Sequence, residues 1–319
     1  MKDIPTWTIP VGVVAVASVI YAWYKVRDER AQNPFADKYL TERGMGMPVI
    51  WLYYDNSEVN SRWWADFGAR SSRAINLPFL NLCYDTIAKM NKDHYRIEVI
   101  SGLSDLAVRL GGWDALPHPL RNPLASVRSP ELNWIRAAVL AKFGGLWLQP
   151  AVICMKPFGD LPDNQVVFFG TNPEDSFSGP AGTKVPSLKA IWSPKPQHPI
   201  FVEWASRAYT RLDSTSGGRQ VRGDEKSDYV ELAYGNVMVD PGAELSRKGK
   251  SGKPIQLEDL LAAGEEDKLH FAVPSDTIYV PFPWPELKER RMFGWFLRMS
   301  EEQILGSDLV ASTLFRSVL

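Results

Sequence analysis

The sequence predicts an α/β fold in which a largely parallel sheet is covered by helices on both faces. Short apolar and aromatic runs, typical of buried strands, alternate along the chain with longer segments that have helical spacing. Strands are predicted at 49–54 (VIWLYY) and 95–100 (YRIEVI), with a helix at 77–91 between them and a short helix with a glycine stop at 103–112. Since parallel neighbours need a crossover, this alternation favours βαβ units.

The best-defined helix is predicted at 129–143. Ser129 suits the N-cap and Pro130 the first helical position. Its buried face is predicted from four residues at helical spacing: Leu132, Ile135, Val139 and Phe143. Gly144 and Gly145 end the helix, and a strand follows at once at 146–148.

The remaining elements are predicted from shorter patterns. Strands are expected at 151–155, 166–169 and 190–192, and an amphipathic helix at 198–212. Ser300 and Gln303 match a capping box, and a last packed helix is expected at 310–318.

Residues 4–24 contain no charged side chain and are mostly apolar. At roughly 1.5 Å per residue, this run reaches about 30 Å, the thickness of a bilayer core. We therefore predict a single-pass transmembrane anchor at 1–24, a tether at 25–47 and one globular domain at 48–319. A cleaved signal peptide is the alternative, because Ala15 to Ala17 fits a cleavage site, but its apolar core of about six residues is short.

The charges beside the apolar run predict its orientation. Only Lys2 precedes it, whereas Lys25, Arg27 and Arg30 follow closely. The positive-inside rule then predicts that the domain lies on the cytoplasmic side of the membrane.

Composition excludes two classes of protein. The chain has 36 basic and 37 acidic residues, a net charge of -1, which gives no support for nucleic acid binding. Cys83 and Cys154 are too few for a disulfide framework, and their apolar surroundings predict buried thiols.

One motif spans the helix at 129–143 and the strand after it. It reads Asn133-Trp134-Ile135-Arg136, then Gly144-Gly145-Leu146-Trp147-Leu148-Gln149-Pro150-Ala151-Val152. This stretch resembles the glycosyltransferases with a DXD sugar-binding motif and the related capsular polysaccharide synthesis proteins, which share D-x-x-R, a helix, and G-G-[ILV]-[WY]-[ILV]-D-x-[DT]-V. The likeness is detailed over 129–158 and loose over about 48–210.

The resemblance implies a GT-A fold, a Rossmann-like sheet that holds a nucleotide sugar at the carboxyl ends of its strands. It makes the end of the first strand, at Tyr53, Tyr54 and Asp55, a candidate nucleotide-binding position. In the family, the DXD carboxylates hold Mn²⁺ or Mg²⁺, which stabilises the charge of the leaving diphosphate.

This chain departs from the family at its acidic positions. Gln149 and Ala151 stand at the DXD acids and Asn133 at the acid of D-x-x-R, while Arg136 keeps its charge. An amide and a methyl group offer no anionic oxygen ligands, so we expect no metal cofactor. Five other acids follow predicted strand ends and are expected to cap loops or face solvent: Asp55, Asp160, Asp163, Glu174 and Asp175.

Two functional hypotheses follow. The favoured one is a catalytically silent glycosyltransferase-like protein, a structural component with protein partners in a membrane-associated assembly. Since some relatives of the family occur in large DNA viruses, a virion is one such setting. The alternative is a metal-independent glycosyltransferase that moves a sugar from a nucleotide-sugar donor at the cytoplasmic membrane face, using Arg136 or loop cations.

Overall fold

A computed structural model describes residues 46–55, 77–176, 184–215, 225–233, 235–248, 252–264, 269 and 271–319. The predicted anchor and nearly all of the predicted tether lie outside these residues. Within the described part of the chain, no helix combines the length and the apolar character needed to cross a bilayer.

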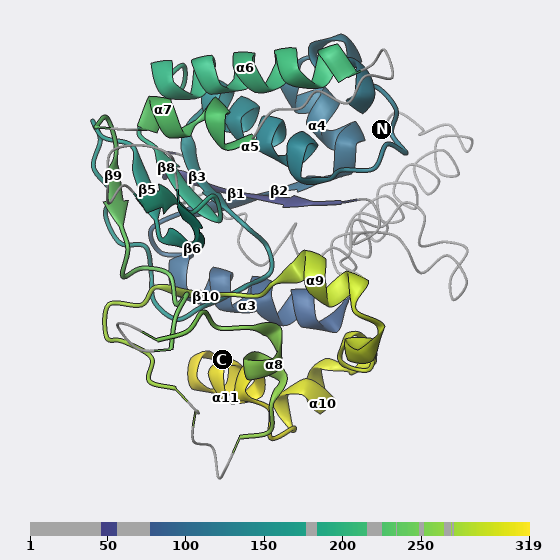
Figure 1. Cartoon of the computed structure of the whole chain (residues 1–319), viewed down its shortest axis with the longest axis vertical. Coiled ribbons are helices and arrows are strands. Elements are labelled where there is room, and N and C mark those ends of the chain that lie inside the picture. Colours follow the sequence, from purple (N-terminus) through teal and green to yellow (C-terminus); the bar gives the residue numbers. More distant parts are fainter. Residues whose placement is uncertain are drawn as a thin grey trace, which may run out of the picture.

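A six-stranded sheet forms the centre of the molecule (Figure 1). Its order is β2 (Arg96–Ser101), β1 (Val49–Tyr54), β3 (Gly145–Leu148), β8 (Ala190–Ser193), β5 (Val167–Phe169) and β9 (Met238–Asp240). β1 is parallel to β2 and β3, and β5 is parallel to β9, whereas β8 runs antiparallel to β3 and β5. The predicted mixed α/β fold with a largely parallel sheet is confirmed.

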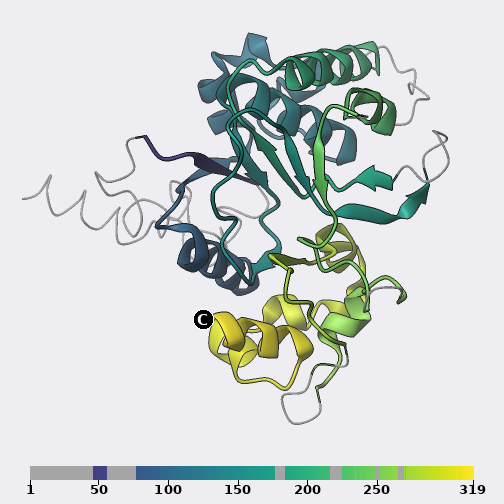
Figure 2. The same cartoon turned by 90° about the vertical axis from the view of Figure 1, so that its left-hand side faces the viewer.

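Helices cover both faces of this sheet (Figures 1 and 2). Above it lie α4 (Gly102–Leu110), α5 (Ser129–Phe143), α6 (Pro199–Thr215) and α7 (Val230–Ala233). Below it lie α3 (Pro78–Asn91), α8 (Leu257–Leu261), α9 (Trp284–Glu289), α10 (Glu301–Leu305) and α11 (Val310–Val318).

Short elements complete the described chain. β4 (Val152–Cys154) pairs with β10 (Tyr279–Pro281), and β6 (Thr171–Ser176) pairs with β7 (Lys184–Pro186). The 3₁₀ turns are η3 (Trp113–Ala115), η4 (His118–Leu120), η5 (Glu225–Asp228), η6 (Arg291–Phe293) and η7 (Phe296–Arg298).

The strands of the sheet divide their side chains between two hydrophobic cores. In β1, Ile50, Leu52 and Tyr54 belong to the lower core, while Trp51 and Tyr53 belong to the upper one. Successive side chains of a strand point to opposite faces, so a strand covered on both sides reads as a continuous apolar run. This is why the VIWLYY stretch predicts a buried strand correctly.

The helix predicted at 129–143 is present, but the prediction of a single buried face is wrong. Every residue from Asn133 to Ala141 is buried, because α5 lies between the sheet and α6. The N-cap is Arg128 instead of Ser129, and its backbone N–H donates to the Glu131 carboxylate at 2.9 Å. A helix enclosed in this way needs apolar or paired side chains all round.

Two local predictions are confirmed. The Ser300 hydroxyl accepts from the Gln303 backbone N–H at 3.2 Å, and the Gln303 side-chain oxygen accepts from the Ser300 N–H at 2.9 Å. Cys83 and Cys154 are free and buried. Burial raises the pKa of both thiols, that of Cys154 to about 12, so both remain protonated at neutral pH.

Candidate functional site

The strand order reverses between β1 and β3. The chain leaves β1 through α3 below the sheet to reach β2, and then returns through α4 and α5 above the sheet to β3 (Figure 1). In open α/β sheets, ligands bind outside the carboxyl ends of the strands at such a switch point. The residues that follow these two strands are Asp55 and Gln149, and both are half-buried.

Gln149 and Ala151 have different surroundings at the end of β3. The Gln149 backbone N–H donates to the carbonyl of Lys189 at 2.7 Å, and the residue is partly exposed. Ala151 is 1% exposed, belongs to the lower core and accepts the Phe282 N–H at 2.9 Å. The motif therefore carries a partly exposed glutamine and a buried methyl group.

The two motif positions on α5 point to different neighbours. The Asn133 side-chain amide donates to the Asp228 carboxylate at 3.2 Å, and its oxygen accepts the Trp204 indole N–H at 3.2 Å. Asp228 also binds the Arg211 guanidinium, at 2.5 Å. The Asn133 side chain thus joins α5 to α6 and η5 in a buried polar network.

Arg136 lies against the sheet. Its guanidinium carbon is 5.6 Å from the centre of the Trp147 ring in β3, and the residue is 8% exposed. A guanidinium at this distance from an indole makes a cation–π contact. The structure therefore brings Arg136 to β3, whereas it commits Asn133 to the interface between helices.

Tyr53 and Tyr54 are both buried and lie in opposite cores. Because the two rings point to opposite faces of β1, they do not line one common surface. Of the three candidate nucleotide-binding residues at this strand end, Asp55 is the one that is not buried.

The other acids predicted after strand ends are dispersed. Asp160 and Asp163 are exposed in the loop after β4. Glu174 and Asp175 follow β5 as predicted, but they lie within the next strand, β6, and not in a loop. Among the residues that the structure describes, no three His, Cys, Asp or Glu side chains gather in a way that would hold a metal ion.

A charged cluster that sequence reasoning missed lies at the same edge of the sheet. Lys189 Nζ is 2.6 Å from Glu244 Oε1, and the Glu244 side chain is 0% exposed. The Tyr279 hydroxyl lies 3.0 Å from Glu244 Oε2 and donates to the Phe169 carbonyl at 2.5 Å. Burial, and then the neighbouring Glu244 charge, raise the pKa of Tyr279 well above its usual value.

These residues do not fit the Mn²⁺ or Mg²⁺ of the DXD family. Such ions take several oxygen ligands, usually including carboxylates. Here the family's positions carry Gln149 and the buried Ala151, and the Glu244 carboxylate is already paired with Lys189. The Asp240 carboxylate accepts the Gly242 N–H at 3.1 Å and so caps its own turn.

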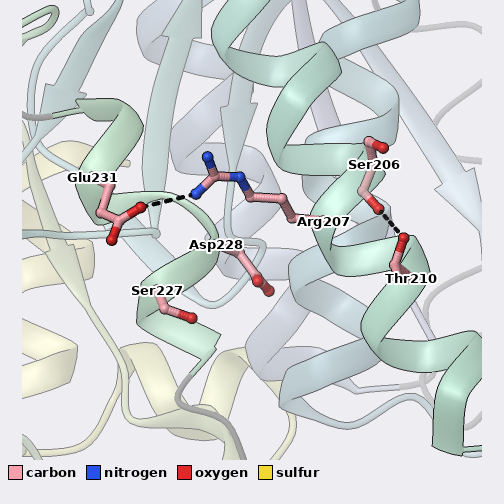
Figure 3. Close-up of a pocket in the computed structure, with 6 residues that line it drawn as sticks. All are labelled: Ser206, Arg207, Thr210, Ser227, Asp228 and Glu231. Atoms are coloured by element: carbon pink, nitrogen blue, oxygen red, sulfur yellow. Dashed lines mark hydrogen bonds and ion pairs between the residues drawn. The ribbon is translucent and has the colours of Figure 1, made fainter.

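A polar pocket of about 500 Å³ lies elsewhere, between α6 and the η5–α7 segment (Figure 3). Its lining residues are Ser206, Arg207, Thr210, Ser227, Asp228 and Glu231. Arg207 bridges Glu203 at 2.9 Å and Glu231 at 3.1 Å, and both carboxylates are more than half exposed. Exposed ion pairs of this kind contribute little to stability. None of the motif residues lines this pocket, whether Asn133, Arg136, Gln149 or Ala151.

Comparison with known proteins finds no matching family model and no matching curated protein. Among solved structures, the chain is similar to the PaToxG glycosyltransferase, with 14% identity, a TM-score of 0.35, and coverage of 59% of this chain and 69% of that one. It is similar to galactosyltransferase LgtC in complex with donor and acceptor sugar analogues, with 12% identity, a TM-score of 0.40, and coverage of 85% and 96%.

A third solved structure is the apo form of the glycosyltransferase GlyE of Streptococcus pneumoniae TIGR4. The identity is 10%, the TM-score is 0.32, and the match covers 63% of this chain and 46% of GlyE. All three neighbours are glycosyltransferases. Because no family model matches, the resemblance to the DXD and capsular polysaccharide families rests on residues 129–158.

Proposed function

We propose that this protein is a membrane-anchored, glycosyltransferase-like protein of GT-A type that binds a nucleotide sugar at the carboxyl ends of β1 and β3 without transferring the sugar. The observation that carries the proposal is the end of β3. There, Gln149 and the buried Ala151 replace two carboxylates, while the strands, the helices and the Gly144–Gly145 junction around them are intact.

Without the two carboxylates, the site lacks the ligands for the cation that assists sugar transfer in the DXD family. Cleaving the bond between a sugar and a nucleoside diphosphate leaves negative charge on the diphosphate, and a bound cation stabilises that charge. An acid placed at position 151 would be a charge inside the lower core, which is costly. The burial of position 151 therefore argues against a metal ligand there.

Sugar binding is compatible with the same residues. Gln149 is partly exposed, and a side-chain amide both donates and accepts hydrogen bonds, as a sugar hydroxyl requires. The hydrogen bond from its backbone N–H to the Lys189 carbonyl fixes the backbone of Gln149 at the end of β3.

The alternative, a metal-independent glycosyltransferase, needs a cation that reaches the diphosphate. Arg136 keeps the family's charge, but it is 8% exposed and packs on Trp147. We therefore propose donor binding as the function and metal-independent sugar transfer as the alternative.

The donor hypothesis is tested by titrating the purified full chain, in detergent micelles, with UDP- and GDP-sugars. We expect binding with a dissociation constant in the micromolar to millimolar range, about -4 to -8 kcal/mol, that is unchanged by Mn²⁺ or EDTA, with no release of free sugar. Calorimetry measures binding, and chromatography of the reaction mixture measures sugar release.

Each contrary result has a distinct meaning. Turnover without added metal supports the active alternative. Failure to bind any of these donors at millimolar concentration overturns the donor site.

We also propose that residues 4–24 hold the protein in a bilayer, with the domain on the cytoplasmic side and protein partners in an assembly such as a virion. The expected result is that the full chain sediments with membranes and resists extraction at alkaline pH. The control is Val13→Arg with Val16→Arg, since each arginine in the middle of a span costs about 2.5–3.5 kcal/mol. A mature chain that begins after Ala17, detected by mass spectrometry, would show a cleaved signal peptide instead.

A further inference from the structure

Lys189 occupies the middle of the sheet's carboxyl edge. It directly precedes β8, and because β8 is antiparallel, its first residues meet the carboxyl ends of β3 and β5. The Lys189 carbonyl accepts the Gln149 N–H at 2.7 Å, and the Ser187 N–H donates to the Gly170 carbonyl at 3.0 Å. The residue therefore sits beside the position of the first missing motif acid.

A buried carboxylate fixes the direction of the Lys189 side chain. Glu244, which is 0% exposed at its side chain, holds Nζ at 2.6 Å, and the buried Tyr279 hydroxyl lies against its other oxygen. Gly170 makes room for this carboxylate, since a Cβ there would lie 2.3 Å from Glu244 Oε2. The position of the ammonium group is thus fixed by Glu244, which is itself buried and in contact with Tyr279.

The Lys189 side chain is not fully enclosed by its neighbours. The Lys189 side chain is 36% exposed, and the Glu244 carboxylate is its one ion-pair or hydrogen-bond partner among the described residues. An ammonium carries three donors, so two remain for a ligand. The lysine side chain is therefore partly open to a ligand, whereas the Glu244 carboxylate that pairs with it is buried.

We infer that Lys189 binds the diphosphate of a nucleoside diphosphate sugar, as the positive group at an edge that lacks metal ligands. The inference rests on the proposed function, because it names the group that holds the donor. A lysine ammonium is a compact point charge that binds phosphate oxygens. In the free protein the same ammonium compensates the buried Glu244, which would otherwise be an unpaired charge.

Another ion pair serves as a control, because it has a similar lysine but lies away from the carboxyl edge of the sheet. Lys248 lies 2.5 Å from Asp259, with side-chain exposures of 39% and 22%. This pair joins the segment before α8 to α8 itself, and not to the ends of the sheet strands. Lys248 is therefore a matched control for the charge, geometry and exposure of Lys189.

The test is calorimetric titration of the full chain in detergent micelles with UDP, GDP, UDP-glucose and GDP-mannose, in EDTA. Lys189→Gln is expected to weaken binding about tenfold or more, the usual effect of losing a hydrogen bond to a charged group. Lys189→Arg should retain most of the affinity, and Lys248→Gln should match the wild type. Equal binding by Lys189→Gln and the wild type would overturn the inference and leave the proposed function standing.

A double variant covers the case in which Lys189→Gln fails to fold because Glu244 is left unpaired. Lys189→Gln with Glu244→Gln exchanges the ion pair for two neutral amides of similar size, so no buried charge is stranded. This variant must still lose donor binding, whereas Glu244→Gln alone must keep it. Binding by the double variant at wild-type affinity overturns the inference, and absence of binding by the wild type overturns the proposed function as well.

Discussion

Gly145→Ala is expected to lower the free energy of unfolding by about 3–5 kcal/mol, the upper part of the sum of overpacking at about 1–3 kcal/mol and backbone strain at about 1–2 kcal/mol. A Cβ at this position would lie 2.6 Å from the Val49 carbonyl oxygen and 3.1 Å from Trp51 Nε1. Neither neighbour is free to retreat, because β1 is hydrogen-bonded to β2 and β3, and Trp51 Nε1 donates to the Gly144 carbonyl at 2.8 Å. Gly145 also has φ +88°, which favours glycine.

The control for this substitution is Gly112→Ala. Gly112 has φ +121°, but a Cβ there meets nothing within 4 Å. It therefore isolates the backbone strain, which we expect to cost about 1–2 kcal/mol. Urea unfolding followed by tryptophan fluorescence measures both variants. If Gly145→Ala costs no more than Gly112→Ala, the close approach of β3 to β1 is contradicted.

Phe79→Ala is expected to lower the free energy of unfolding by about 3–5 kcal/mol, as for other buried phenylalanines. Phe79 is 1% exposed and begins α3. Its ring centre lies 4.6 Å from that of Phe282, 5.3 Å from that of Phe296 and 6.2 Å from that of Phe315. Phe282 lies between β10 and α9, Phe296 lies in η7 and Phe315 lies in α11, so the ring packs α3 against the C-terminal segments in the lower core.

The matched control is Leu124→Ala, because Leu124 is 87% exposed. We expect it to change the free energy of unfolding by less than about 0.5 kcal/mol. Thermal unfolding of the full chain, followed by circular dichroism in the near ultraviolet, measures both variants. A Phe79→Ala protein with wild-type stability would show that the C-terminal helices do not depend on this aromatic cluster.

The sequence by itself determined several elements of the fold. The strands β1 and β2 and the helices α3 and α5 lie within one residue of where the apolar patterns predict them, and α5 ends at Gly144 as predicted. These signals are local, because side-chain burial and helix ends depend on neighbours a few residues away. The motif positions Gln149 and Arg136 are read from the sequence for the same reason.

Only the tertiary structure decided what those motif residues contact. Asn133 bonds Trp204 and Asp228, which lie 71 and 95 residues further along the chain. Ala151 is buried, so its position no longer faces a ligand. α5 is enclosed on all sides because α6 covers it, which no periodicity within α5 can indicate.

The contact between Lys189 and Glu244 also depends on the tertiary structure. The two are 55 residues apart and belong to no motif. They meet because antiparallel β8 enters between β3 and β5 and because Gly170 leaves space for a carboxylate. The local pattern thus specified the strand β3 and the residues that replace the motif acids after it, whereas the order of strands brought Lys189 next to Gln149 and paired its side chain with Glu244.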